Sequence, residues 1–94
     1  MTKLVIITGI AADKFEEKES QPVLALFDGE LYGIVGTTDG VSDEHLLSEF
    51  TANIGDSEES IPPAFLWPVF FQGAVTADSE DLKGVEVRTI HTFA

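Results

Sequence analysis

The feature that most constrains this chain is a run of eighteen residues without charge, from Ser60 to Ala77, that is rich in aromatic side chains. It holds the only Trp of the sequence, Trp67, and three of its seven Phe residues. Apolar surface of this extent has to be covered by the rest of the chain or by a partner, because large exposed apolar patches are rare on soluble monomers. The fold is therefore expected to form around this run.

A membrane-spanning helix needs about 20 apolar residues, so the length of the run raises that alternative. Pro62, Pro63 and Pro68 argue against it, because proline lacks an amide donor and Pro68 would interrupt a helix in mid-span. We instead predict a strand over 61–77, whose core face would carry Phe65, Trp67, Val69, Phe71 and Val75. Because Pro68 cannot donate to a neighbouring strand, this strand is expected at the edge of a sheet or at a bulge.

Two further segments show the pattern of strands. Residues 4–12 form an almost continuous apolar run rich in β-branched side chains, which is typical of a central strand covered on both faces. Residues 85–93 alternate in polarity and would place Val85 and Phe93 on the same face of a closing strand.

Asp28-Gly29 gives the strongest hairpin signal in the chain, because this dipeptide suits the tight turn between two antiparallel strands. It separates the apolar segments 23–27 and 30–35. A two-residue turn would place Phe27 opposite Glu30 and fix the register of the whole hairpin.

One helix is predicted from Ser42, a good N-cap residue, to about Asn53. Asp43 and Glu44 would lie in its first turn, where the helix dipole favours anions, and Gly55 follows its C-terminal end. An apolar stripe predicts that the helix packs on the sheet, and it consists of Leu46, Leu47, Phe50 and Ile54.

Together these elements predict a single compact α+β domain over residues 1–94, in the order β-β-β-α-β-β. The sheet is expected to be mainly antiparallel, with about five strands and one helix packed on it. The length of 94 residues suffices for one modest core, because a chain of this size buries roughly 60 to 65% of its extended surface.

The chain is strongly acidic, with seventeen Asp and Glu against five Lys and Arg and a formal net charge of −12. Residues 19–82 contain thirteen of the acidic residues and no Lys or Arg. A field of this sign opposes direct binding to nucleic acid or to an anionic membrane, so a basic protein partner is expected. General solubility or adaptation to a salty cytoplasm would explain the same composition.

No cysteine is present, which excludes disulfides, thiolate metal ligands and cysteine nucleophiles. The two histidines lie on different predicted elements, His45 as an exposed first-turn residue and His91 as a half-buried strand residue. No serine lies in a nucleophile-elbow motif, and the glycines between 33 and 40 match no phosphate-binding loop. We therefore predict no catalytic residue and no cofactor, and we favour a non-enzymatic protein.

The amino-terminal apolar run is predicted to be a strand rather than a signal peptide. Thr8-Gly9 interrupts it, and Lys3 is the only basic residue ahead of it. This interpretation predicts a cytoplasmic protein, in the host cytoplasm if a phage encodes it.

The leading functional hypothesis is an acidic protein-binding module, encoded by a phage or mobile element, that inhibits its target by occupying a basic nucleic-acid-binding surface. Carboxylates would mimic the phosphates of the nucleic acid, and exposed apolar residues would form the contact core. The protein is expected to be a monomer or a weak homodimer. The predicted partner contacts are Asp39, Asp43, Glu44, Glu49, Asp56, Glu58 and Glu59.

Two alternatives remain open. A structural or self-assembling subunit would pair through the aromatic strand 61–77 with another copy. A metal-binding protein or small enzyme would use the acidic loops 56–59 and 78–81 as oxygen ligands, although neither loop has the spacing of an EF-hand. Neither loop leads us to predict a metal ligand.

Overall fold

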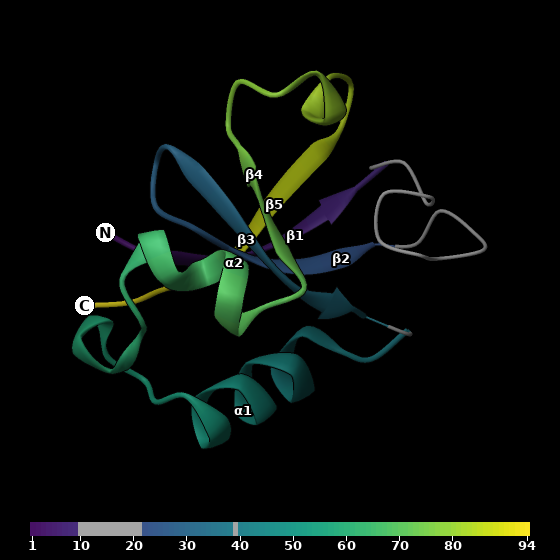
Figure 1. Cartoon of the computed structure of the whole chain (residues 1–94). Coiled ribbons are helices and arrows are strands. Elements are labelled where there is room, and N and C mark those ends of the chain that lie inside the picture. Colours follow the sequence, from purple (N-terminus) through teal and green to yellow (C-terminus); the bar gives the residue numbers. More distant parts are fainter. Residues whose placement is uncertain (10–21, 39) are drawn as a thin grey trace.

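The computed structural model describes residues 1–9, 22–38 and 40–94, and within these ranges the chain forms an antiparallel sheet of five strands with helices packed on it (Figure 1). The strands are β1 (Lys3–Thr8), β2 (Val23–Phe27), β3 (Leu31–Thr37), β4 (Gly73–Thr76) and β5 (Glu86–Thr92). The helices are α1 (Asp43–Asn53) and α2 (Trp67–Phe70), and 3₁₀ turns lie at Glu58–Ser60, Ala64–Leu66 and Glu80–Leu82. The predicted α+β class with a mainly antiparallel sheet is confirmed.

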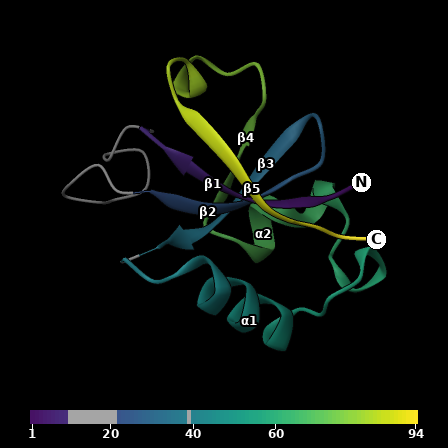
Figure 2. The same ribbon diagram turned by 180° about the vertical axis from the view of Figure 1, so that it is seen from behind.

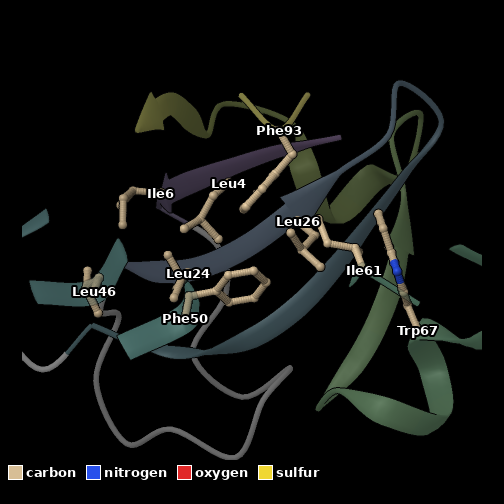
Figure 3. Packing of buried hydrophobic residues seen from close by; sticks show 9 residues of the cluster. All are labelled: Leu4, Ile6, Leu24, Leu26, Leu46, Phe50, Ile61, Trp67 and Phe93. Carbon is tan, nitrogen blue, oxygen red and sulfur yellow. The ribbon is translucent and has the colours of Figure 1, made fainter. Parts of the chain in front are cut away.

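The strands lie in the order β4-β3-β2-β1-β5, and alternate side chains of β1 and β2 enter two separate hydrophobic clusters. Leu4 and Leu26 face the cluster that α1 and α2 cover (Figure 3), whereas Val5 and Ala25 belong to the cluster on the other face. All four residues are at most 1% exposed. A strand buried on both faces needs apolar residues at every position, which explains the unbroken run in β1. The predicted interior position of β1 is confirmed, and residues 10–12 of that prediction lie outside the described ranges.

The connection from β4 to β5 runs from one edge of the sheet to the other, as Figures 1 and 2 show from opposite sides. Leu82 and Val85 of this connection pack against the second cluster. The two faces of the sheet are therefore covered differently, one by the helices and the other in part by this connection. No helix in the described ranges is long and apolar enough to cross a membrane.

The prediction of a continuous strand over 61–77 is wrong. Residues 64–70 form a 3₁₀ turn followed by α2, and only Gly73–Thr76 form a strand, which pairs with β3 at the edge of the sheet. Pro68 lies in the first turn of α2, where a missing amide donor costs nothing because first-turn donors have no partner within the helix. The edge position expected from Pro68 is nevertheless correct for β4.

Trp67 is buried, as predicted, and packs directly on the backbone of β3. Its side chain is 1% exposed, and its indole N–H donates a hydrogen bond of 2.9 Å to the carbonyl oxygen of Pro62. A Cβ atom added to Gly33 would lie 2.7 Å from Cε3 of the indole, so only glycine leaves room for the ring there. Gly33 therefore marks a close approach of β3 and the indole of Trp67.

The hairpin between β2 and β3 forms, but its predicted register is wrong by two residues near the turn and by three beyond a register shift between Leu24 and Ala25. Phe27 pairs with Tyr32 instead of Glu30, and their rings stack with centroids 4.5 Å apart. A side-chain contact widens the turn, because Oδ1 of Asp28 accepts hydrogen bonds from the backbone N–H groups of Glu30 and Leu31, at 2.8 and 2.6 Å. Near the turn, the shift of two residues keeps the side chains on their predicted faces, whereas beyond the irregularity Leu24 and Val23 lie opposite Gly36 and Thr37.

The closing strand β5 also departs from simple alternation. Opposite β1, Leu4 pairs with His91 and Val5 with Thr89, so one extra residue of β5 forms a bulge. The bulge places Phe93 in the cluster under α1, while Val85 packs on the other face of the sheet. The prediction that Val85 and Phe93 share a face is therefore wrong.

Candidate protein-interaction face

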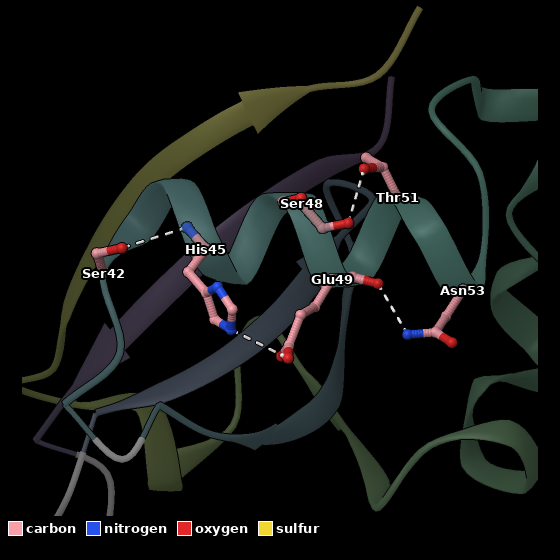
Figure 4. Close-up of polar contacts among 6 residues, drawn as sticks. All are labelled: Ser42, His45, Ser48, Glu49, Thr51 and Asn53. Atoms are coloured by element: carbon pink, nitrogen blue, oxygen red, sulfur yellow. Dashed lines mark hydrogen bonds and ion pairs between the residues drawn. The ribbon is translucent and has the colours of Figure 1, made fainter.

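The residues from 43 to 71, which we call the helical layer, cover one face of the sheet with α1, α2 and the turns between them. α1 begins as predicted, because the hydroxyl of Ser42 accepts a hydrogen bond from the backbone N–H of His45 at 3.3 Å (Figure 4). It ends at Asn53 with Ile54 as its C-cap residue, and Gly55 follows with a φ of 123° that favours glycine. Leu46 and Phe50 point from α1 into the core.

The helical layer contains six Asp and Glu residues and no Lys or Arg. All six are among the seven predicted partner contacts, and they are Asp43, Glu44, Glu49, Asp56, Glu58 and Glu59. The seventh, Asp39, lies outside the described residues. The structure divides the six into those with a structural partner in the chain and those that face solvent.

Asp43 is paired with Arg88 of β5. The guanidinium donates two hydrogen bonds to the carboxylate, one of them 3.1 Å long between Nη2 and Oδ1. This contact lowers the pKa of Asp43 below its usual value and raises that of Arg88, with hydrogen bonding as the main cause. Because Arg88 is 45 residues away in the sequence, no local pattern could reveal the pair. The charge of the Asp43 carboxylate is therefore already paired with a cation of the same chain.

Glu58 ties the two ends of the chain together. Its Oε1 accepts hydrogen bonds from the backbone N–H and the hydroxyl of Thr2, at 2.8 and 3.2 Å, and its own N–H donates to the carbonyl of Ala94 at 3.3 Å. The backbone N–H of Phe93 donates to the carbonyl of Thr2, so the termini lie side by side (Figure 2). These contacts support a structural role for Glu58.

The other four acidic residues have exposed carboxylates, and we call them the free carboxylates: Glu44, Glu49, Asp56 and Glu59. Glu49 contacts His45 one helical turn away, with 3.1 Å between Oε1 and Nε2, and both side chains are more than half exposed (Figure 4). Within the described ranges the other three make no side-chain hydrogen bond or ion pair. These four carboxylates are the part of the predicted contact set that is available to a partner.

The helical layer also exposes three large apolar side chains, which we call the apolar patch. Phe65 is 78% exposed, Val69 79% and Phe70 61%. As residues of a strand, Phe65, Trp67 and Val69 would share the core face; in a helical turn, residues two apart differ in direction by about 200°, so Trp67 points inward and its neighbours outward. The prediction that Phe65 and Val69 are core residues is therefore wrong.

An apolar groove of about 230 Å³ lies between α1 and the sheet. Two polar residues of α1, Glu49 and Asn53, also line it. The apolar lining comes from β2, β3, α1 and the residue after α2, and consists of Leu24, Val35, Leu46, Phe50, Ile54 and Phe71. No pattern in the sequence indicated this groove, because its walls come from separate elements that each looked like ordinary core.

The residues weighed for catalysis and metal binding lie on different elements. His45 is exposed in the first turn of α1 and His91 is half-buried on β5, where its ring meets that of Phe93 edge to face. Across residues 1–9, 22–38 and 40–94, no three His, Asp or Glu side chains are grouped so as to hold a metal ion. The acidic loops 56–59 and 78–81 thus form no such group within the described chain.

Comparison of the chain with protein-family models, with curated proteins and with solved structures finds no match in any of the three.

Proposed function

We propose that this protein is a non-enzymatic, cytoplasmic binding module whose helical layer docks on the basic surface of a partner protein. In the specific form of the proposal, it is a phage- or mobile-element-encoded inhibitor, and the surface it occupies is one with which the partner binds nucleic acid. The free carboxylates would then take the places of phosphates, and the apolar patch would form the centre of the contact.

The observation that carries the proposal is the exposure of Phe65, Val69 and Phe70 within a layer that has carboxylates and no Lys or Arg. Three large exposed apolar side chains within six residues cost solubility unless a partner covers them. Protein interfaces typically combine such an apolar centre with a polar rim. The charge of the rim supports a basic partner, because like charges across an interface repel.

Self-assembly is the second candidate, since the apolar patch could meet its copy in another chain. Self-assembly would not use an aromatic strand, because Phe65 and Phe70 lie on helical turns and β4 holds only Gly73–Thr76. A net charge of −12 on each copy opposes direct contact between two helical layers. We therefore rank a basic partner first.

The test uses the tagged protein to retain partners from an extract of its native source. Three variants accompany it: a patch variant (Phe65→Ser, Val69→Ser, Phe70→Ser), a charge variant that turns the four free carboxylates into amides, and a control with the same change in charge elsewhere. The control replaces exposed carboxylates outside the helical layer with amides, at Glu30, Asp78, Glu80 and Glu86.

A stoichiometric basic protein should be retained by the wild type and the control, and lost from the patch and charge variants. Nucleic acid should compete with the retention if the occupied surface is a nucleic-acid-binding one. Retention that is equal for all four proteins would contradict the proposal, and so would self-association as the only interaction observed.

A further inference from the structure

The apolar groove is too small for most small-molecule ligands and well suited to one side chain. Its volume is about 230 Å³, whereas pockets for drug-sized ligands span roughly 300–1,000 Å³. Protein interfaces often concentrate their energy in a single large side chain that fills a pocket of the partner. The groove has the size and the apolar lining for such an anchor.

The polar groups of the groove add a preference for charge. Glu49 lines it together with Asn53, and the Asn53 amide donates to the backbone carbonyl of Glu49 at 2.8 Å (Figure 4). The Glu49 side chain is 63% exposed, and its other contact is with His45 at the surface of the helix. An anchor in the groove would therefore have a carboxylate beside it, and no Lys or Arg lies between residues 19 and 82 to compensate that charge.

The groove is also continuous along the chain with the apolar patch, since Phe71 lines the groove and Phe70 belongs to the patch. An anionic or neutral occupant would offer Glu49 no cationic partner beside its exposed contact with His45, and a second copy of this acidic chain would bring more negative charge to it. We propose that the groove binds one large apolar side chain of the basic partner, flanked by a Lys or Arg that pairs with Glu49. This inference rests on the proposed function and adds to it a recognition element of defined chemistry.

The groove can be tested without the partner, by titrating the full-length protein with three probes that share a phenylpropyl group. Phenylpropylammonium, phenylpropanol and 4-phenylbutanoate attach the same phenylpropyl group to a cationic, a neutral and an anionic head group. Heteronuclear NMR should show shifts at the backbone amides of Leu46, Phe50 and Phe71 with the ammonium probe. Its affinity should exceed that of the alcohol by about two- to fivefold, as expected for one exposed ion pair, and the carboxylate should bind least.

The variants separate a local contact from the general negative field. Glu49→Gln should remove the preference for the ammonium head group, whereas Glu30→Gln, which changes the net charge equally in a turn away from the groove, should keep it. Ile54→Phe, which enlarges a side chain that lines the groove, should abolish binding of all three probes. Should Ile54→Phe fail to fold, the comparison of Glu49→Gln with Glu30→Gln decides the question on its own.

Shifts that do not map to the groove, equal affinities for the three head groups, or an unchanged preference in Glu49→Gln would each overturn the inference. Such a result leaves the proposed function standing if the patch variant still loses its partner. Conversely, selective binding of the ammonium probe together with a patch variant that keeps every partner would support the groove and contradict the proposed function.

Discussion

The contact between Trp67 and Gly33 gives the sharpest prediction about stability. A methyl group at position 33 would lie 2.7 Å from Cε3, 2.9 Å from Cδ2 and 3.2 Å from Cβ of Trp67. The backbone at position 33 cannot move away from the indole, because β3 is held between β2 and β4, with Gly33 paired to Leu26 and Ala74. Overpacking of this kind typically costs about 1–3 kcal/mol.

The sign of the effect should depend on the indole. Without a clash, Gly→Ala at a compatible backbone position stabilises by about 0.4–1 kcal/mol, because the unfolded chain loses freedom. Gly33→Ala should therefore destabilise the wild type by about 1–3 kcal/mol and be neutral or stabilising in a Trp67→Leu background. The two substitutions would then couple by more than about 1 kcal/mol, which only residues in contact show.

Urea unfolding followed by far-UV circular dichroism measures all four members of this cycle, since Trp67, the only fluorophore of its kind, is absent from two of them. Large-to-small changes of a buried aromatic cost about 3–5 kcal/mol when taken to Ala, against a total stability of about 5–14 kcal/mol for a chain of this length. Leu keeps part of the buried volume and with it a folded baseline. Additive free energies of unfolding in the cycle would refute the proposed packing of the indole on β3.

Four further outcomes follow from individual contacts. Emission from Trp67 in the native wild type should be blue-shifted relative to free indole in water, because the ring is 1% exposed; emission like that of the free compound would rule out burial. Glu58→Ala should lower the free energy of unfolding by about 1 kcal/mol through the lost hydrogen bonds to Thr2. Glu59→Ala, as the control, should change it by less than about 0.5 kcal/mol. Equal effects of the two substitutions in urea unfolding would refute the stabilising contact between Glu58 and Thr2. Arg88 lowers the pKa of Asp43, so the stabilisation from this ion pair is complete above the unfolded pKa of about 4 and is lost as pH falls through the lower folded pKa. Arg88→Gln should remove this part of the dependence of stability on acid pH. Matching pH profiles of stability for wild type and variant would exclude a contribution of the pair. Burial raises the pKa of Tyr32, so the free energy of unfolding should decline as pH rises above about 10. Tyr32→Phe should reduce this decline at alkaline pH. An identical decline in the variant would show that another group causes it.

The sequence predicted elements whose signals are local and failed where the signal was ambiguous or distant. Ser42 and Gly55 delimit α1 because capping depends on neighbouring residues. The run 61–77 gave no such information, because a segment that is apolar at nearly every position shows neither the strand nor the helix period. The hairpin register failed for a smaller reason, since the Asp28 carboxylate rather than the Asp-Gly pair alone shapes the turn.

The candidate site was predictable in composition and not in arrangement. The acidity of residues 39–59 is visible in the sequence, but the partners that occupy Asp43 and Glu58 lie 45 and 56 residues away. Phe65 and Val69 were assigned to the core because a correct observation, the absence of charge in this run, was combined with the wrong periodicity. The groove required four separate segments, β2, β3, α1 and the residue after α2, to come together, which no pattern along the chain encodes.

Two explanations of the acidity lead to opposite expectations for the charge variant, in which the four free carboxylates become amides. If these carboxylates form an interaction face, the variant should bind the basic partner more weakly and with a flatter salt dependence, while its stability stays equal or rises through reduced self-repulsion. If they serve adaptation to high salt, the wild type should need molar salt to fold, and the variant should relieve that need without changing any association. We expect the first outcome, because the free carboxylates share one layer with the exposed Phe65, Val69 and Phe70, and adaptation to salt does not explain exposed apolar side chains. Thermal unfolding at low and high salt, measured beside partner affinity for the wild type, the charge variant and the matched control, separates the two. Unchanged affinity with an unchanged salt slope would exclude these four residues from the interface.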